Sequence, residues 1–145
     1  MSTDANWKRK IYDLYCNIMR DVPSNDEHTE RTLWNFEKQK LKAPGFEPKA
    51  YFIALDKGQY IGQSSLWRQK SKPKEFWTDL TGVARSHRRK GIALALKIKT
   101  VRFAYQSGAE YIVTDNEENN PMFNINQLLG FIPRSAWLTF EKQYN

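Results

Sequence analysis

The chain has 145 residues and a mass of 17.1 kDa, which predicts one domain with a core large enough to fold without disulfides. Hydrophobic residues make up 40% and charged residues 27%, a composition that argues against disorder. The sequence contains no apolar run of membrane-helix length and no N-terminal apolar signal segment, so we expect a cytoplasmic protein with no membrane partner. One cysteine and two histidines argue against a disulfide framework and a zinc site, so no metal is expected.

The net charge of +7 is concentrated in one segment of the chain. Residues 68–102 contain eleven basic and two acidic residues, whereas the segments before and after carry net charges of only +1 and −3. Such an excess raises nucleic acid as a partner. Few aromatic residues interrupt the basic segment, however, so a stacking surface for bases is poorly supported. A smaller docked anion or a solvated basic face are the other interpretations.

Two helices are predicted in the first part of the chain. Their apolar positions recur at helical spacing: Ile11, Leu14, Tyr15 and Ile18 in the first, and Leu33, Phe36 and Leu41 in the second. The first helix is expected to end before Pro23, and the second to be capped by Thr29 and to end at Pro44.

Strands are predicted over residues 51–55, 60–67 and 76–83. A short turn with Gly58 separates the first two strands, which indicates an antiparallel hairpin. A polar segment around Pro73 connects the hairpin to the third strand. These three segments would form the first part of a sheet.

A loop over residues 84–90 precedes a helix whose buried stripe would consist of Leu94, Ile98, Val101 and Tyr105. A fourth strand over 111–114, a helix from Pro121 to Gly130 and a last strand region over 131–140 complete the chain. The order α-α-β-β-β-α-β-α-β predicts a single α/β (mixed α+β) domain over residues 1–145. Its sheet would be mixed, largely antiparallel and flanked by helices.

The segment between Val83 and Leu94 carries the strongest functional signal. It brings several basic residues and Gly91 to the point where a strand ends and a helix begins. Unpaired N–H groups and the helix dipole favour an anion at such a point, and glycine lets the backbone approach it closely. Neither the Walker pattern nor the GxGxxG dinucleotide pattern is present. The segment therefore predicts a phosphate cradle of another kind, with a basic surface turn as the alternative.

The residues Arg88-Arg89-Lys90-Gly91-Ile92-Ala93 resemble the R/Q-x-x-G-x-G/A motif of the GNAT superfamily of acyl-CoA-dependent N-acetyltransferases. A second match, Asn119-Asn120-Pro121-Met122 followed by Leu129-Gly130-Phe131, resembles the segment after the family's fifth strand. The order of predicted elements is similar to the family over nearly the whole chain. In detail, the two motifs look like one half of the tandem GNAT proteins of the mycothiol synthase type.

The resemblance implies transfer of an acetyl group from acetyl-CoA to a primary amine of a small molecule or peptide by direct attack. The pantetheine arm would lie along Thr81, Gly82 and Val83, and Asn119 would contact the pantetheine or the thioester. The loop residues that would hold the pyrophosphate are Arg88, Arg89, Lys90, Gly91, Ile92 and Ala93. A backbone N–H near Val83 would stabilise the developing oxyanion.

The catalytic residues are less well specified. Many family members have a tyrosine four residues before the closing Gly-Phe as general acid for the thiolate, and Asn126 stands at that position here. Asparagine donates a hydrogen bond but supplies no proton at a useful pKa, so the thiolate would leave unassisted, another group would serve, or the activity would be weak. Period-two alternation would place Asp79, Thr81 and Val83 on one strand face. This makes Asp79, together with Glu75, a candidate proton relay from the substrate ammonium, with a water chain or a plain salt bridge as alternatives.

Three points stay open at this level. An acyl-CoA-binding module of the same fold, with weak or partner-dependent activity, is the runner-up function, and nucleic-acid binding ranks last. The acceptor amine and the oligomeric state, with a homodimer as one possibility, are not predicted. The loop motif does not explain Arg68, Lys70, Lys72 and Lys74, which could serve the 3′-phosphate of CoA, an acidic partner or solubility.

Overall fold

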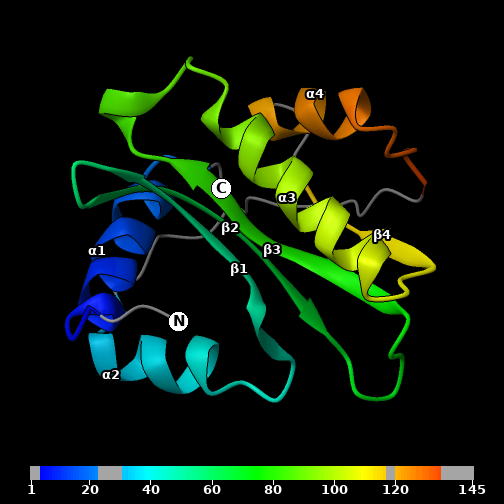
Figure 1. The fold of residues 1–145 in the computed structure, drawn as a ribbon, viewed down its shortest axis with the longest axis horizontal. Coiled ribbons are helices and arrows are strands. Elements are labelled where there is room, and N and C mark those ends of the chain that lie inside the picture. The colour runs from blue at the N-terminus through cyan, green and yellow to red at the C-terminus, as the bar shows by residue number, and fades with distance from the viewer. Residues whose placement is uncertain (1–3, 23–30, 117–119, 135–145) are drawn as a thin grey trace, which may run out of the picture.

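The computed structural model describes residues 4–22, 31–116 and 120–134. Within them, four strands form one sheet in the order β1-β2-β3-β4 (Figure 1). The strands are β1 (Phe46–Asp56), β2 (Gln59–Arg68), β3 (Glu75–Val83) and β4 (Tyr111–Val113). The first three strands pair antiparallel, and β4 pairs parallel to β3. This mixed, largely antiparallel sheet with flanking helices confirms the predicted fold class.

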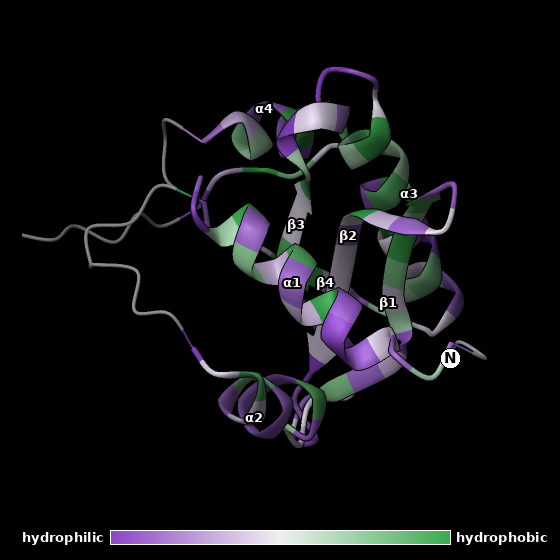
Figure 2. Cartoon of the chain, turned by 90° about the vertical axis from the view of Figure 1, so that its left-hand side faces the viewer, coloured by the Kyte–Doolittle hydropathy of each residue, from purple (hydrophilic) through white to green (hydrophobic). Residues whose placement is uncertain are grey.

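Helices cover both faces of the sheet. They are α1 (Trp7–Met19), α2 (Leu33–Phe36), which continues as the π-helical turn η1 (Glu37–Leu41), the short 3₁₀ helix η2 (Arg85–His87), α3 (Ile92–Gln106) and α4 (Pro121–Leu128). Figures 1 and 2 show α1 and α2 on one face and α3 on the other, with α4 beside α3. We call these the α1 face and the α3 face.

Each face has its own hydrophobic core. On the α3 face, Leu66 and Phe76 are buried together with Ala104, and Phe103 packs edge-on against the ring of Phe76. On the α1 face, Ile11 and Tyr15 of α1 are buried with Phe36 of α2, and the Tyr15 and Phe36 rings lie 4.9 Å apart. Since the sheet separates these two cores, a ligand site on one face can be changed without repacking the other.

Helix α3 presents a different side to the sheet from the one predicted. Ile98 and Tyr105 are 40% and 81% exposed, and the buried side chains are Leu96, Lys97, Thr100 and Ala104. These four positions also recur at helical spacing, but hydropathy overlooked them because two of them are polar. The Thr100 hydroxyl donates to the Lys97 carbonyl at 2.8 Å, so the hydroxyl can be buried without loss of a hydrogen bond.

Element boundaries also differ from the sequence-based expectation. Thr32 caps α2 through the Asn35 N–H, whereas the predicted cap Thr29 lies outside the described residues. Strand β1 begins at Phe46 because a register shift accommodates Pro48 in this edge strand. Residues 131–134 form no strand, and the rest of the predicted last strand lies outside the described residues.

Candidate functional site

Strands β3 and β4 separate after a short stretch of pairing. The paired residues run from Glu75–Tyr111 to Trp77–Val113, and the Thr78 hydroxyl donates to the Thr114 hydroxyl at 2.6 Å just beyond them. Further along β3, pairing within the described residues is with β2 alone. Apart from the Val83 carbonyl, which accepts from Arg88 Nε, the backbone groups on the β4 side of the stretch from Thr81 to Val83 have no strand partner among the described residues and can hydrogen-bond an extended ligand.

A β-bulge in β3 redirects Asp79. Ser64 pairs with Thr81 and Leu66 with Thr78, so two residues of β3, Asp79 and Leu80, lie opposite Ser65. The extra residue reverses the alternation of side chains beyond it and commonly marks the neighbourhood of an active site.

The bulge makes the prediction that Asp79, Thr81 and Val83 share a face wrong. Asp79 lies on the α1 face, where it contacts η1 through Lys40. A Cβ on Gly82 would meet Ile18 of α1, so the neighbours of Gly82 in the strand, Thr81 and Val83, face α3. Period-two reasoning failed because it assumes an uninterrupted ladder.

The loop between β3 and α3 is held in place by its own arginines. Arg88 donates from Nε to the Val83 carbonyl at 2.9 Å and from Nη2 to Asp21 at 2.7 Å. Arg85 binds the same carboxylate through two nitrogens. Hydrogen bonds from both guanidinium groups hold the pKa of Asp21 well below its usual range. The motif arginine therefore braces the loop against the end of α1.

The start of α3 is open to an anion. Gly91 precedes the 15-residue helix with φ 74°, in the left-handed region, and no side chain caps the helix. Arg89 is also left-handed, at φ 63°, and a Cβ placed on Gly91 would meet nothing within 4 Å. The N–H groups of Ile92 and Ala93 have no partner within the helix, so they and the exposed Lys90 can bind a phosphate.

A chain of side-chain hydrogen bonds links the point where β3 and β4 separate to Asn126 on α4. Thr114, already bonded to Thr78, donates to Asn116 Oδ1 at 3.4 Å, and Asn126 Nδ2 donates to the same oxygen at 2.5 Å. Asn126 is only 4% exposed, and its own Oδ1 is buried with no hydrogen-bond partner among the described residues. A buried carbonyl oxygen of this kind can accept a hydrogen bond from a bound ligand. Asn119 lies outside the described residues.

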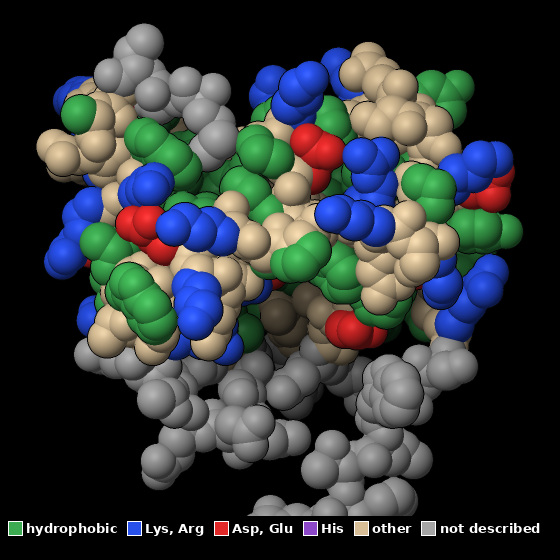
Figure 3. Space-filling model, turned by 90° about the horizontal axis from the view of Figure 1, so that it is seen from below, with side chains coloured by type: hydrophobic (Ala, Val, Ile, Leu, Met, Phe, Trp, Pro, Cys, Tyr) green, Lys and Arg blue, Asp and Glu red, His purple; other side chains and the backbone are tan. Residues whose placement is uncertain are grey.

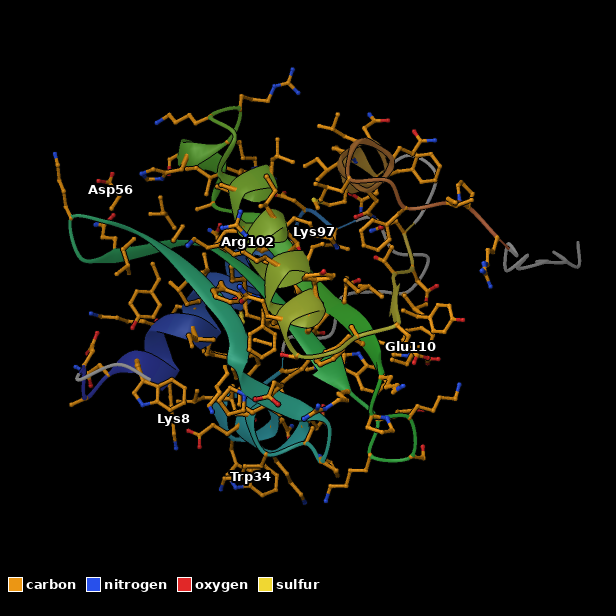
Figure 4. All side chains as sticks on the ribbon, turned by 45° about the vertical axis from the view of Figure 1, so that its right-hand side comes forward. Lys8, Trp34, Asp56, Lys97, Arg102 and Glu110 are labelled. Atoms are coloured by element: carbon orange, nitrogen blue, oxygen red, sulfur yellow. The ribbon has the colours of Figure 1, made fainter. Side chains whose placement is uncertain are left out.

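Lys97 is a candidate site residue that the sequence analysis did not single out. It is 2% exposed and lies on the side of α3 toward α4 (Figure 4), with Nζ 5.5 Å from the centre of the Phe131 ring. No carboxylate of the described residues pairs with its ammonium group. Burial lowers the pKa of Lys97 to about 8. The available signal was a single lysine inside the otherwise apolar run from Ile92 to Ile98.

The α1 face holds a cavity of about 630 Å³ beneath η1. Aromatic side chains from four elements line it: Tyr15, Phe36, Phe46, Tyr51 and Trp67. Asp79 is its one acidic lining residue among those described, and its Oδ1 lies 2.5 Å from Lys40 Nζ. The Tyr51 hydroxyl donates to Gln63 at 2.9 Å, and burial raises the pKa of Tyr51. The volume is that of a small-molecule site.

The four unexplained basic residues lie at the other end of β3 from the loop after Val83. Arg68 pairs with Glu47, Lys72 with Glu75, and Lys74 with Glu110. β3 has nine residues and so separates them from that loop by roughly 25–30 Å. They are therefore not part of the anion site at α3. Lys70 instead lines the cavity on the α1 face, which Arg68 also borders, but the Arg68 guanidinium lies 5.3 Å from the centre of the Phe76 ring on the α3 face.

None of the helices in the described part of the chain is both long and apolar enough to span a bilayer. Its His, Cys, Asp and Glu side chains form no cluster suited to a metal ion.

Comparisons with known proteins agree with this geometry. The model of the acetyltransferase (GNAT) family matches residues 9–131. No curated protein matches the chain. Among solved structures, the aminoglycoside N-acetyltransferase AAC(6′)-Iy in complex with CoA superposes with a TM-score of 0.68 at 18% identity, covering 98% of this chain and 92% of the other.

Two more structures show the same fold. The aminoglycoside acetyltransferase HMB0005 from an uncultured soil metagenomic sample has a TM-score of 0.62 at 19% identity, with 100% and 95% of the two chains covered. Ard1 from Thermoplasma volcanium has a TM-score of 0.68 at 14% identity, with 88% and 80% covered. The family match over most of the chain, together with these neighbours, makes this protein a member of the acetyltransferase (GNAT) family and an acyltransferase.

Proposed function

We propose that the protein transfers an acetyl group from acetyl-CoA to a primary amine. The observation that carries this proposal is the position of β3 between two candidate binding surfaces. The unpaired edge of β3 and the uncapped start of α3 form one of them, and the 630 Å³ cavity on the α1 face forms the other. Asp79, at the bulge in β3, lines that cavity. An acyl donor and an amine could therefore meet across the strand.

The described residues fit an acyl-CoA. Backbone N–H groups at Ile92 and Ala93, with Lys90 beside them, suit a pyrophosphate. The unpaired edge through Thr81, Gly82 and Val83 suits the amides of a pantetheine arm. Bound acetyl-CoA would supply the activated acyl group, and a β3 backbone N–H near Val83 would donate to the oxygen on which charge develops.

Lys97 and Asn126 are the residues we propose for the thiol end of the site. Asn126 is connected to the start of the β3–β4 separation through Asn116 and Thr114, and its Oδ1 has no hydrogen-bond partner in the described part of the chain. Lys97 supplies a desolvated amine whose pKa of about 8 is close to that of a thiol. Such an amine can stabilise or protonate a leaving thiolate at neutral pH, which asparagine alone cannot do.

Asp79 is the residue we propose for the amine side. Its carboxylate faces the cavity and accepts from Ser65 Oγ at 3.3 Å as well as from Lys40. A substrate ammonium could take the place of the Lys40 contact and lose its proton to Asp79 or to water beside it.

Two measurements test the proposal. We expect calorimetry to detect acetyl-CoA binding, and a free-thiol assay over a panel of primary amines to detect turnover well above thioester hydrolysis. Absence of binding at millimolar acetyl-CoA would reject the proposal. Removal of the carboxylate in Asp79→Asn should lower kcat more than it raises the Kd of acetyl-CoA.

One observation favours the runner-up, a module that binds acyl-CoA without efficient transfer. The position that carries a tyrosine in many relatives is Asn126, whose side chain is already engaged with Asn116. Binding of acetyl-CoA with no thiol release for any amine of the panel would support this second function. The likeness to one half of a tandem protein stays a prediction.

A further inference from the structure

We infer that the protein acetylates its own Lys40, on Nζ, when acetyl-CoA is bound and no other amine is present. This inference rests on the proposed function, because it takes acetyl-CoA as the acyl donor and the cavity on the α1 face as the side from which the amine attacks. It goes beyond that function by assigning a modification site and an internal substrate. Three observations carry it: the contacts of the Lys40 ammonium group, the position of Asp79 along β3, and the helical turn that bears Lys40.

The ammonium group of Lys40 lies where the acceptor ammonium is expected. Its Nζ is 2.5 Å from Oδ1 of Asp79, the residue proposed to take the proton. The other oxygen of that carboxylate accepts from the Ser65 hydroxyl at 3.3 Å, so both oxygens are held in place. The same Nζ lies 5.9 Å from the centre of the Tyr15 ring, within the range of a cation–π contact. A carboxylate beside an aromatic ring is the arrangement that binds an alkylammonium group.

Asp79 adjoins the point where the sheet opens. The hydroxyls of Thr78 and Thr114 make the contact between β3 and β4 just beyond their paired residues, and Asp79 follows Thr78 in the chain. A bulge in β3 begins at the same residue. The thiol end of acetyl-CoA is proposed at this place too, because Thr114 is linked through Asn116 to Asn126. An acyl chain that follows the unpaired edge of β3 toward Thr78 would therefore end beside the residue that holds the Lys40 amine.

The turn that bears Lys40 directs its two lysines differently. This turn, η1, is π-helical, a rare conformation that is frequent at functional sites. Lys38 is exposed, and its Nζ lies 4.9 Å from the centre of the Trp34 ring, which is itself 67% exposed. Lys40 instead lines the cavity and contacts Asp79. Of the two, Lys40 is the one placed to react with a bound acyl group.

The reaction needs only this chain and acetyl-CoA. Asp79, or water beside it, takes a proton from the Lys40 ammonium group, and the free Nζ attacks the thioester carbonyl carbon. An N–C bond forms, the C–S bond breaks, and the thiolate of CoA gains a proton to leave as free CoA. The product side chain is an uncharged acetamide, so Asp79 loses its cationic partner. Each chain can carry out this reaction once.

Peptide-resolved mass spectrometry of the protein incubated with acetyl-CoA tests the inference. We expect acetylation at Lys40 to be about tenfold or more faster than at Lys38, although the Lys40 side chain is only 28% exposed. Figure 3 shows the end of the molecule at which α2 lies, where several Lys and Arg side chains are exposed, so an uncatalysed reaction would have other targets. The rate per chain should stay constant over a hundredfold range of protein concentration, because the contact lies within one chain.

A second acetyl donor and a set of variants supply the controls. Acetyl phosphate lacks the CoA moiety and should modify Lys38 ahead of Lys40, because Lys40 is less exposed and ion-paired. Asp79→Asn should slow acetylation of Lys40 by acetyl-CoA about tenfold or more, whereas a lysine that is merely reactive would react faster once its ion pair is lost. Lys38→Arg, on the same turn, should leave acetylation of Lys40 unchanged, and Lys40→Arg should leave no preferred site.

The outcomes separate this inference from the proposed function. Acetylation of added amines with Lys40 left unmodified would overturn the inference and leave the acetyltransferase proposal standing. Equal rates at Lys40 and Lys38 with acetyl-CoA, or a faster rate at Lys40 in Asp79→Asn, would overturn the inference as well. Failure of acetyl-CoA to bind would reject the proposed function itself, and with it the inference.

Discussion

The two faces of β3 differ in what they offer a ligand. The α3 face offers mainly backbone groups: an unpaired strand edge, an uncapped helix start and, at depth, the buried polar side chains of Lys97 and Asn126. The α1 face offers side chains, with aromatic rings around the Lys40–Asp79 pair. Backbone donors can bind a cosubstrate such as acetyl-CoA whatever side chains surround them. Side chains can be exchanged singly, so this face is the one on which specificity can change.

The largest expected effect is the loss of acetyl-CoA binding on the α3 face alone. Gly91→Val places a β-branched residue at φ 74°, which forces the loop out of the left-handed conformation. We expect the Kd of acetyl-CoA to rise by at least 100-fold in calorimetry.

Gly108→Val is the matched control for this change. Gly108 also has a left-handed φ, 78°, with open space around its Cβ, but it lies beyond the other end of α3. Both variants should lose a similar amount of stability, and only Gly91→Val should lose acetyl-CoA. Equal loss of binding in both would mean that strain, and not the loop, controls affinity.

The second effect concerns Lys97. Lys97→Met keeps the length of the side chain and removes the amine, so kcat should fall by tenfold or more with little change in the Kd of acetyl-CoA. Lys97→Arg, which keeps the charge but cannot lose its proton, should not restore the rate. An unchanged kcat in the methionine variant would remove Lys97 from the thiol end of the site.

The stability of the same variant gives an independent readout. The pKa of Lys97 is about 8 in the native state and 10.5 when exposed, so between these values the unfolded chain binds a proton that the native protein has released. Stability conferred by this group therefore rises with pH from about 8 to 10.5, by at most about 3 kcal/mol. Denaturant unfolding should show this rise in the difference between the native protein and Lys97→Met. A constant difference across this window would mean that the amine is not buried.

The third prediction tests whether α1 or a ligand requires a glycine at position 82. A Cβ at this position would lie 2.3 Å from Cγ2 of Ile18, so the glycine is required by α1 and not by a ligand on the α3 face. Gly82→Ala should cost about 1–3 kcal/mol of unfolding free energy.

A double-mutant cycle with Ile18→Ala isolates that contact. Because the truncated side chain removes the clash, the two substitutions should be less than additive, with a coupling of about 1 kcal/mol or more. The double variant should bind acetyl-CoA like Ile18→Ala alone. Strict additivity would mean that the strand, and not Ile18, opposes the extra methyl group.

The contrast between the faces also explains what sequence could predict. The fold class and the loop around Gly91 were predicted because local patterns encode them: strand and helix periods, and a glycine where φ must be positive. The face on which the Asp79 side chain lies was not predicted, since it depends on a bulge that only the pairing of β2 with β3 creates. The cavity was not predicted either, because its lining comes from α1, η1, β1 and β2, which meet only in the folded chain.

The basic segment shows the same limit from another side. Its charge excess suggested one anionic partner, but folding divides it between two ends of β3. Lys90 lies at the start of α3, whereas Lys70 lines the cavity on the α1 face and Arg68 pairs with Glu47. Arg88 donates hydrogen bonds to Asp21 and to the Val83 carbonyl and so holds the loop in place. A linear count of charge therefore cannot distinguish a residue that binds a ligand from one that braces the site.

The smallest expected effect concerns this bracing. Asp21→Asn weakens the hydrogen bonds from Arg85 and Arg88 that join the loop to the end of α1, so Tm should fall by about 2–5 °C and the Kd of acetyl-CoA should rise several-fold. The native pKa of Asp21 lies below the unfolded value of 3.8, so its contribution to stability is present above pH 3.8 and is lost as pH falls through the native pKa. The difference in Tm between the native protein and the variant should therefore shrink below pH 4. Asp13→Asn, which breaks an exposed pair with Arg9 on the same helix, should alter neither Tm nor acetyl-CoA affinity appreciably. A similar Kd change in both variants would show that surface charge, and not the position of the loop, controls affinity for the anion.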